Sequence, residues 1–132
     1  VCPGDERNAR TNFTSDLVPT TIGNLGTSYF VGRDCDETAP QMFLSGDRNM
    51  TNQQYTLDFK TAGSYNKNIK VAATDVNVAA KINGWGWTDQ HVHQSAGNLL
   101  LGDGSVQQVT AKLLRQQLKN SGDPTNLLVF PQ

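Results

Sequence analysis

The pair Asp103-Gly104 constrains the fold of this chain more than any other sequence feature. It stands between two runs that contain apolar residues, and an Asp-Gly pair in that position is the strongest short-range signal for a β-hairpin. A two-residue type I′ turn needs positive φ at both central residues, which Asp and Gly tolerate. The sequence therefore predicts a central hairpin over 98–110 in which Leu101 lies opposite Val106.

A short helix is predicted directly after the hairpin, over about 111–120. Thr110 is a favourable N-cap residue, and Leu114 and Leu118 recur at the spacing of one helix face. Gly122 is placed to end the helix, because glycine adopts the left-handed conformation of a helix C-terminus at little cost.

Four further segments have the composition of β-strands, because β-branched and aromatic residues cluster in them between turn residues. They are 28–32, 41–45, 54–59 and 127–130. The segment 68–81 alternates like a strand, but its alanine pairs also suit a helix, so both interpretations stay open. Together with the hairpin and the helix, these segments predict an α+β fold with an antiparallel sheet, in a single domain over residues 1–132.

Composition argues against several classes of protein. The chain has 132 residues, a net charge of −1, 36% hydrophobic residues and no run of like charges. The basic surface of a nucleic-acid-binding protein is therefore not expected. The apolar runs are only a few residues long, far short of the roughly 20 residues that a membrane-spanning helix requires. The sequence thus predicts a soluble domain that does not bind nucleic acid.

Two cysteines, Cys2 and Cys35, form an even count. In an exported protein they could close a loop of about thirty residues with a disulfide, whereas in the cytosol they would stay reduced. Both possibilities remain open from the residues alone. No Cys-x-x-Cys pair is present, which argues against redox or zinc chemistry at these thiols.

The acidic segment that contains Asp34, Asp36 and Glu37 resembles the start of a calcium loop. It lacks the glycine and the distal glutamate of an EF-hand, so that motif is not matched. A looser calcium site is one interpretation, and a solvated acidic loop is the other. We predict no bound cofactor, with calcium as the alternative.

A second group of candidates lies before the hairpin. Asp89, His91 and His93 fall on one side of an extended segment, a spacing that could hold Zn²⁺ or Cu²⁺, although two histidines are few for a metal site. Trp85 and Trp87 could stack against a sugar or a partner, or could cover one edge of the sheet.

No pattern for nucleophilic catalysis or nucleotide binding is present. The chain has no Gly-x-Ser-x-Gly elbow and no Walker or dinucleotide-binding glycine pattern, and neither cysteine has a histidine next to it in sequence. We therefore predict that the chain is not an enzyme.

His93, nine intervening residues and Asp103-Gly104 match the H-X9-DG pattern of the prepilin-type processing-associated domain of bacterial pseudopilin-like proteins. The chain resembles this family over essentially its whole length. The further matches, in order, are Cys2-Pro3-x-Asp5, Leu25-x-x-Ser28-Tyr29-Phe30-Val31-Gly32, Gly46-Asp47-Arg48-Asn49, Gly97-Asn98, Asp103-Gly104-Ser105-Val106 and the end from Leu127 to Pro131.

The resemblance implies the soluble head of a type II secretion pseudopilin or type IV pilin-like subunit. Such a subunit has a leader that a leader peptidase removes and an apolar N-terminal helix, here absent, that anchors it in the inner membrane. The head would lie outside the cytoplasm, in the periplasm or at the cell surface, and would contact other pilin-like subunits or secretion-system proteins. By the resemblance, its motif residues shape the backbone, and the pair His93 and Asp103 is not a protease site.

The resemblance has two limits. Family members usually carry a small residue where this chain has Cys35, so a bridge to Cys2 would be peculiar to this protein. The calcium ligands of major pseudopilins are not reproduced. The expected function is therefore structural, with a secreted carbohydrate- or protein-binding module as the alternative and a metal-dependent hydrolase as the third possibility.

Overall fold

The structure is a computed structural model, and the residues that it describes are 1–8, 26–51, 67–72, 85–89, 92–123 and 125–131. The predicted strand 54–59 therefore lies outside the described residues, as does His91. Of the segment 68–81, which the sequence left open, the first residues belong to the strand β4 (Lys67–Ala72). The rest of that segment is outside the described residues.

An antiparallel sheet forms the centre of the described fold. Its six strands follow the order β4-β8-β1-β2-β6-β7, and every neighbouring pair is antiparallel. Besides β4, the strands are β1 (Tyr29–Gly32), β2 (Phe43–Asp47), β6 (Ala96–Leu101), β7 (Val106–Thr110) and β8 (Thr125–Phe130). A second, two-stranded sheet pairs β3 (Met50–Thr51) with β5 (Gly86–Trp87). With the helix α4 (Ala111–Asn120), this is an α+β fold.

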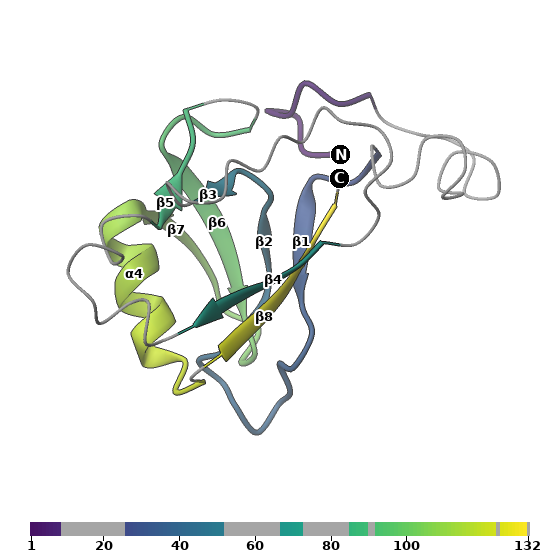
Figure 1. The fold of residues 1–132 in the computed structure, drawn as a ribbon. Helices are drawn as coiled ribbons and strands as arrows, with labels where there is room; N and C mark the ends of the chain where they lie inside the picture. Colours follow the sequence, from purple (N-terminus) through teal and green to yellow (C-terminus); the bar gives the residue numbers. More distant parts are fainter. Residues whose placement is uncertain (9–25, 52–66, 73–84, 90–91, 124, 132) are drawn as a thin grey trace, which may run out of the picture.

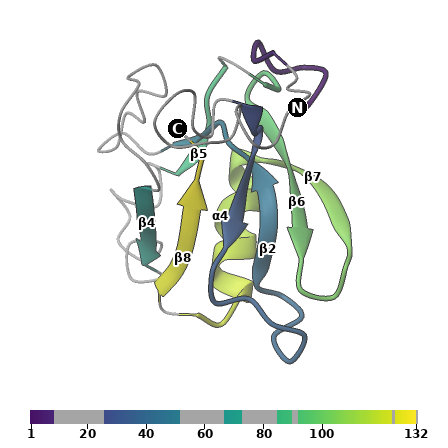
Figure 2. The same ribbon diagram turned by 90° about the vertical axis from the view of Figure 1, so that its right-hand side faces the viewer.

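The helix α4 packs on one face of the large sheet, as Figures 1 and 2 show. Its buried residues Leu114 and Leu118 belong to the same hydrophobic core as Phe30 of β1 and Phe130 of β8. The rings of Phe30 and Phe130 have their centroids 5.0 Å apart. Burial of these side chains, at about 1.5–3 kcal/mol each, is the main force that holds the helix on the sheet.

The opposite face of the sheet carries the alternate residues. Tyr29 and Val31 of β1 flank the buried Phe30 and are 42% and 54% exposed. The strand register places Val31 opposite Ser45 of β2, and Ser45 lies opposite Leu100 of β6. No described helix or strand covers this side, which faces the viewer in Figure 2, and we call it the open face.

The predicted hairpin is present, but its turn differs from the prediction. Leu100, not Leu101, lies opposite Val106. Only Gly104 in the turn has positive φ, at 82°, and its N–H donates to the Leu101 carbonyl at 3.0 Å. The loop is therefore a three-residue turn with glycine in the left-handed position, a common hairpin geometry. The two-residue type I′ turn was wrong because Asp103 does not adopt positive φ.

The predicted helix agrees with α4. Thr110 is the N-cap residue in extended conformation, although its side chain makes no capping hydrogen bond. Gly122 follows the helix with a φ of 71°, the left-handed geometry expected there. The predicted strands 28–32, 41–45 and 127–130 correspond to β1, β2 and β8, with ends shifted by one or two residues. Among the described helical residues, no helix has the length and apolar character needed to cross a membrane.

Candidate functional site

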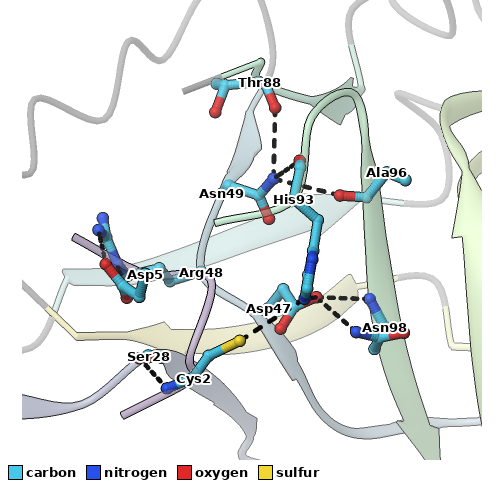
Figure 3. A network of polar contacts seen from close by, with 10 residues as sticks. All are labelled: Cys2, Asp5, Ser28, Asp47, Arg48, Asn49, Thr88, His93, Ala96 and Asn98. Atoms are coloured by element: carbon cyan, nitrogen blue, oxygen red, sulfur yellow. Dashed lines mark hydrogen bonds and ion pairs between the residues drawn. The ribbon is translucent and has the colours of Figure 1, made fainter. Parts of the chain in front are cut away.

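The first residues of the chain pack against one end of the sheet, where polar side chains from four segments meet (Figure 3). The backbone N–H of Cys2 donates to Ser28 Oγ, at the start of β1, at 2.9 Å. Cys2 itself is buried, with 6% of its surface exposed. We call this group the N-terminal clasp, and its residues are Cys2, Asp5, Ser28, Asp47, Arg48, Asn49, His93 and Asn98.

An ion pair joins Asp5 to Arg48 within the clasp. Arg48 Nε donates to Asp5 Oδ2 at 2.8 Å, and Arg48 Nη2 donates to Asp5 Oδ1 at 2.6 Å. Both side chains are almost completely buried. Burial favours the neutral acid, but the hydrogen bonds from Arg48, Ser28 and the Arg7 backbone outweigh it and hold the pKa of Asp5 below its usual value.

Arg7 adds a second cation to this region. Its Nη1 donates to the Thr27 carbonyl at 2.6 Å. Burial and the neighbouring charge of Arg48 lower the pKa of Arg7 to about 10, although the charge of Asp5 acts in the opposite direction. Arg7 therefore stays cationic at neutral pH and ties residues 1–8 to the segment before β1.

Asn49 fixes the loop that leads into β6. Its side-chain Nδ2 lies 2.9 Å from the His93 carbonyl, 3.2 Å from the Ala96 carbonyl and 3.3 Å from the Thr88 carbonyl. An amide has only two N–H groups, so these three acceptors share them. The Asn49 side chain thus supplies a hydrogen-bond donor to backbone carbonyls of this loop. By holding the backbone at His93, it also positions the His93 ring.

Asp47 lies next to the ring of His93 (Figure 3). Its Oδ2 accepts hydrogen bonds from the backbone N–H of Asn98 at 2.6 Å and from Asn98 Nδ2 at 3.1 Å. The side chain is fully buried, and its Oδ1 has no hydrogen-bond partner among the described residues. Burial raises the pKa of Asp47, and the bonds from Asn98 and the charge of His93 offset this only in part.

The imidazole of His93 stands between a thiol and a carboxylate. His93 Nε2 is 3.6 Å from Cys2 Sγ and 3.7 Å from Asp47 Oδ2. Tyr29 lies beside the same sulfur; burial raises the pKa of its hydroxyl, and the contact with Cys2 and the charge of Asp47 act in the same direction. In a catalytic triad the acid holds one ring nitrogen and the nucleophile uses the other. Here both groups approach the same nitrogen.

Packing requires glycine at two positions, Gly46 and Gly97, which belong to the segments that resemble the H-X9-DG family. A Cβ at Gly46 would lie 2.6 Å from the Phe30 ring, and a Cβ at Gly97 would lie 2.6 Å from the Trp87 ring. Both distances are far shorter than carbon–carbon contacts in a packed core. Gly46 and Gly97 therefore allow these aromatic rings to pack directly on the sheet.

The second half of the H-X9-DG pattern lies elsewhere. Asp103 is exposed in the hairpin turn, where its Oδ1 accepts a hydrogen bond from the Ser105 N–H at 2.8 Å. Hydrogen bonds from Ser105 lower the pKa of Asp103. The whole of β6 separates this turn from His93. The structure thus places the pattern's histidine in the clasp and its Asp-Gly pair in a turn.

The acidic candidates lie in the exposed loop between β1 and β2. Asp36 accepts hydrogen bonds from the Thr38 backbone and hydroxyl, which lower its pKa. Asp34 lies beside Arg33, and Glu37 is exposed. In the described parts of the chain, no three His, Cys, Asp or Glu side chains are arranged to hold a metal ion.

Of the metal candidates before β6, the two that the structure describes, Asp89 and His93, do not form one site. Asp89 is exposed, while His93 faces Cys2 and Asp47 instead. Trp85 and Trp87 are only 1% and 7% exposed and belong to the hydrophobic core. The interpretation of these two rings as a stacking platform was therefore wrong, because their faces are covered by core side chains.

The two cysteines are both free thiols and are not paired. Cys2 lies in the clasp, whereas Cys35 donates to the Met42 carbonyl, 3.7 Å away, just before β2 begins. Asp47, which ends β2, is at the clasp, so the two thiols lie at opposite ends of this strand. The disulfide that the sequence offered as one possibility is thus absent from the structure. Burial and the charge of Asp36 raise the pKa of the Cys35 thiol.

Sequence reasoning missed the contacts that build the clasp. Asp5, Arg48 and Asn49 were recognised only as parts of matching motifs, and the partnership between Asp5 and Arg48 spans 43 residues. One signal was available for these contacts. The polar run Asp47-Arg48-Asn49 begins at the last residue of β2. All three residues are buried.

An open hollow of about 250 Å³ lies on the open face of the sheet. Tyr29, Asn98, Leu100 and Val106 are among the residues that line it. Its lining is almost entirely apolar, and no Asp, Glu, His, Lys or Arg is among the residues that line it.

In comparisons with known proteins, no family model, no curated protein and no solved structure matches this chain. The resemblance to the H-X9-DG family therefore remains a prediction from the sequence.

Proposed function

We propose that this chain is the head of a pseudopilin-like structural subunit in a type II secretion or type IV pilus-like system. In this proposal the head lies outside the cytoplasm and binds other pilin-like subunits or secretion-system proteins. An apolar helix that precedes Val1 in the full subunit anchors it in the inner membrane.

The observation that supports the proposal is the N-terminal clasp. Residues from the separate motifs contact one another here: Asp5 pairs with Arg48, and Asn49 binds the His93 carbonyl. Cys2 contacts both Ser28 and the His93 ring, and together these contacts join residues 1–8 to the sheet. A structural subunit needs a rigid joint where its head meets its anchor. The clasp has the properties of such a joint, because its ion pair is buried and its loop is held by side-chain hydrogen bonds.

The proposal is tested on the full-length precursor, expressed in cells with and without a prepilin leader peptidase. Mass spectrometry of the mature N-terminus is expected to show cleavage only where the peptidase is present. Protease added outside the cytoplasm is expected to digest the head of the membrane-anchored protein. A precursor that a general signal peptidase cleaves and releases would instead support the secreted binding module.

One contact favours a second candidate function, cysteine-dependent chemistry. Cys2 Sγ lies 3.6 Å from His93 Nε2, a pairing that can produce a reactive thiolate. Against it, Cys2 is buried, its backbone N–H is already bound to Ser28, and Asp47 does not hold the other ring nitrogen. The rate of Cys2 alkylation in the folded protein distinguishes the two functions.

A further inference from the structure

The strand β7 forms an edge of the large sheet. It is hydrogen-bonded to β6 on one side, and no described strand lies on the other, as Figure 2 shows. Native edge strands are usually protected from pairing by charges, proline or a bulge. The sequence of β7, Val-Gln-Gln-Val-Thr, has no charge and no proline, and its register with β6 is regular. Val106, the first residue of β7, is 68% exposed.

The register of the hairpin identifies the backbone groups that face outward. The Leu101 N–H donates to the Ser105 carbonyl at 3.0 Å, so these two residues form a hydrogen-bonded pair. Such pairs alternate along an antiparallel ladder, and the intervening residues direct their N–H and C=O groups away from the partner strand. On β7 the outward-facing residues are therefore Val106, Gln108 and Thr110, although the carbonyl of Thr110, as the N-cap of α4, also accepts the first hydrogen bond of the helix.

An independent contact agrees with this assignment. Asn98 lies opposite Gln108, and its N–H donates to Asp47 on the β2 side. A hydrogen-bonded pair would have used that N–H toward β7. The N–H and C=O of Gln108 therefore point to the outer edge of the sheet.

We propose that β7 pairs with β7 of a second copy of this chain across a two-fold axis. The outward-facing residues 106, 108 and 110 are centred on Gln108, so an antiparallel copy places Gln108 opposite Gln108 of the second copy. The two residues then exchange both backbone hydrogen bonds. Val106 lies opposite Thr110 of the second copy, and the two sheets become continuous.

Charges beside the strand are complementary in this register. It brings Lys112, in the first turn of α4, close to the hairpin turn of the second copy, which carries Asp103. Both side chains are exposed. Because of the two-fold symmetry, this Lys112–Asp103 approach occurs twice, while no like charges face each other on the strand itself. Self-pairing therefore gives hydrogen-bond partners to the outward-facing N–H and C=O groups of β7. It does so without the charge repulsion by which native edge strands prevent such pairing.

Sedimentation over a concentration series tests this interface with Gln108→Pro. The N–H of Gln108 makes no bond to β6, so proline at this edge position leaves the hairpin ladder intact. The unchanged chain is expected to form a dimer. The Gln108→Pro variant is expected to remain monomeric with an unchanged circular dichroism spectrum. A wild-type chain that is monomeric throughout, or a Gln108→Pro dimer of equal affinity, would overturn the proposal.

A charge-exchange experiment tests the register. Gln108→Lys and Gln108→Glu each place two like charges on the axis and are expected to weaken dimerisation about fivefold. An equimolar mixture of the two variants is expected to recover the affinity as a heterodimer. Gln116→Lys and Gln116→Glu, at an exposed position of α4, are the matched controls and should change neither affinity. Variants that weaken dimerisation but do not recover on mixing would contradict the central position of Gln108.

The dimer proposal does not depend on the proposed function. Leader cleavage of the precursor and pairing of the head are measured separately, so either result can fail while the other stands.

Discussion

The carboxylate of Asp5 receives two hydrogen bonds from the guanidinium of Arg48, and the structure buries both side chains between the first residues of the chain and the sheet. A buried ion pair contributes to stability mainly as a unit. If Asp5 is removed, the buried guanidinium of Arg48 loses two charge-assisted hydrogen bonds. This relationship makes the clasp sensitive to single substitutions at either residue of the pair.

The first prediction concerns the free energy of unfolding. Asp5→Asn is expected to lower it by about 3–5 kcal/mol at pH 7, because the buried guanidinium of Arg48 loses the carboxylate of Asp5 that it is paired with. Asp34→Asn is the matched control. Asp34 lies 3.9 Å from Arg33, and both side chains are more than half exposed. Loss of the Asp34 carboxylate should lower the free energy of unfolding by only about 0–1 kcal/mol. Urea unfolding measures both variants, and equal effects would contradict the role given to the buried pair.

The pH dependence of this contribution follows from the direction of the shift. The pKa of Asp5 is lowered in the folded state from its ordinary 3.8. Its stabilising contribution is therefore fully present above pH 3.8 and is lost as the pH falls through the folded pKa. The stability difference between wild type and Asp5→Asn should be constant near neutrality and should shrink in acid. A difference that vanishes well above pH 4 would argue against this assignment.

The pKa of Asp47 is shifted in the opposite direction from that of Asp5. Burial raises its pKa above 3.8, so its contribution to stability is present below 3.8 and is lost as the pH rises through the folded pKa. In an NMR titration of side-chain carboxyl groups, Asp47 is expected to titrate above Asp5, with the usual aspartate value between the two. The reversed order would show that the hydrogen bonds from Asn98 outweigh burial.

Gly97→Ala is expected to destabilise the fold by about 1–3 kcal/mol, because the added methyl group would overlap the Trp87 ring. Trp87→Leu removes the ring and is also expected to be destabilising. The double variant should cost less than the sum of the two, since the methyl group no longer meets an aromatic ring. Additive effects in thermal unfolding would show that Gly97 has another role.

Gly104→Ala is expected to cost about 1–2 kcal/mol through backbone strain alone. The φ of Gly104 is 82°, and no atom lies within 4 Å of the position a Cβ would take. Gly104→Asn should cost less, because asparagine tolerates this conformation better than alanine does. Two equally destabilised variants in chemical denaturation would point to a steric contact instead.

The two thiols should react at different rates. Cys2 is 6% exposed, whereas Cys35 lies in a partly exposed loop. In the native protein, iodoacetamide is expected to label Cys35 first and Cys2 mainly on unfolding, as mass spectrometry of the peptides can show. Faster labelling of Cys2, with a pH profile that changes in His93→Gln, would support cysteine-dependent chemistry over the structural function.

Local patterns predicted much of the described fold. The spacing of Leu114 and Leu118 and the glycine after the helix were enough to place α4. The Asp-Gly pair indicated the hairpin correctly, but not its register. Register in a short hairpin depends on whether one residue or two adopt positive φ, and Asp103 can be accommodated in either geometry.

The contacts of the clasp could not be predicted in the same way. Asp5 and Arg48, or Asn49 and His93, meet only after the sheet has formed, and nothing in their local sequence specifies the partner. The same reason left two interpretations open at Trp85 and Trp87. Their spacing on a short segment fits an exposed platform as well as a core position, and only the tertiary fold buries them.

The position of the clasp has a mechanical consequence. Ser28 and Arg48, to which the first residues are attached, adjoin β1 and β2, the third and fourth strands of the six in sheet order. Tension applied to Val1 would therefore enter the sheet near its middle instead of peeling away an outer strand one bond at a time. A domain loaded in this manner would resist pulling through many bonds at once.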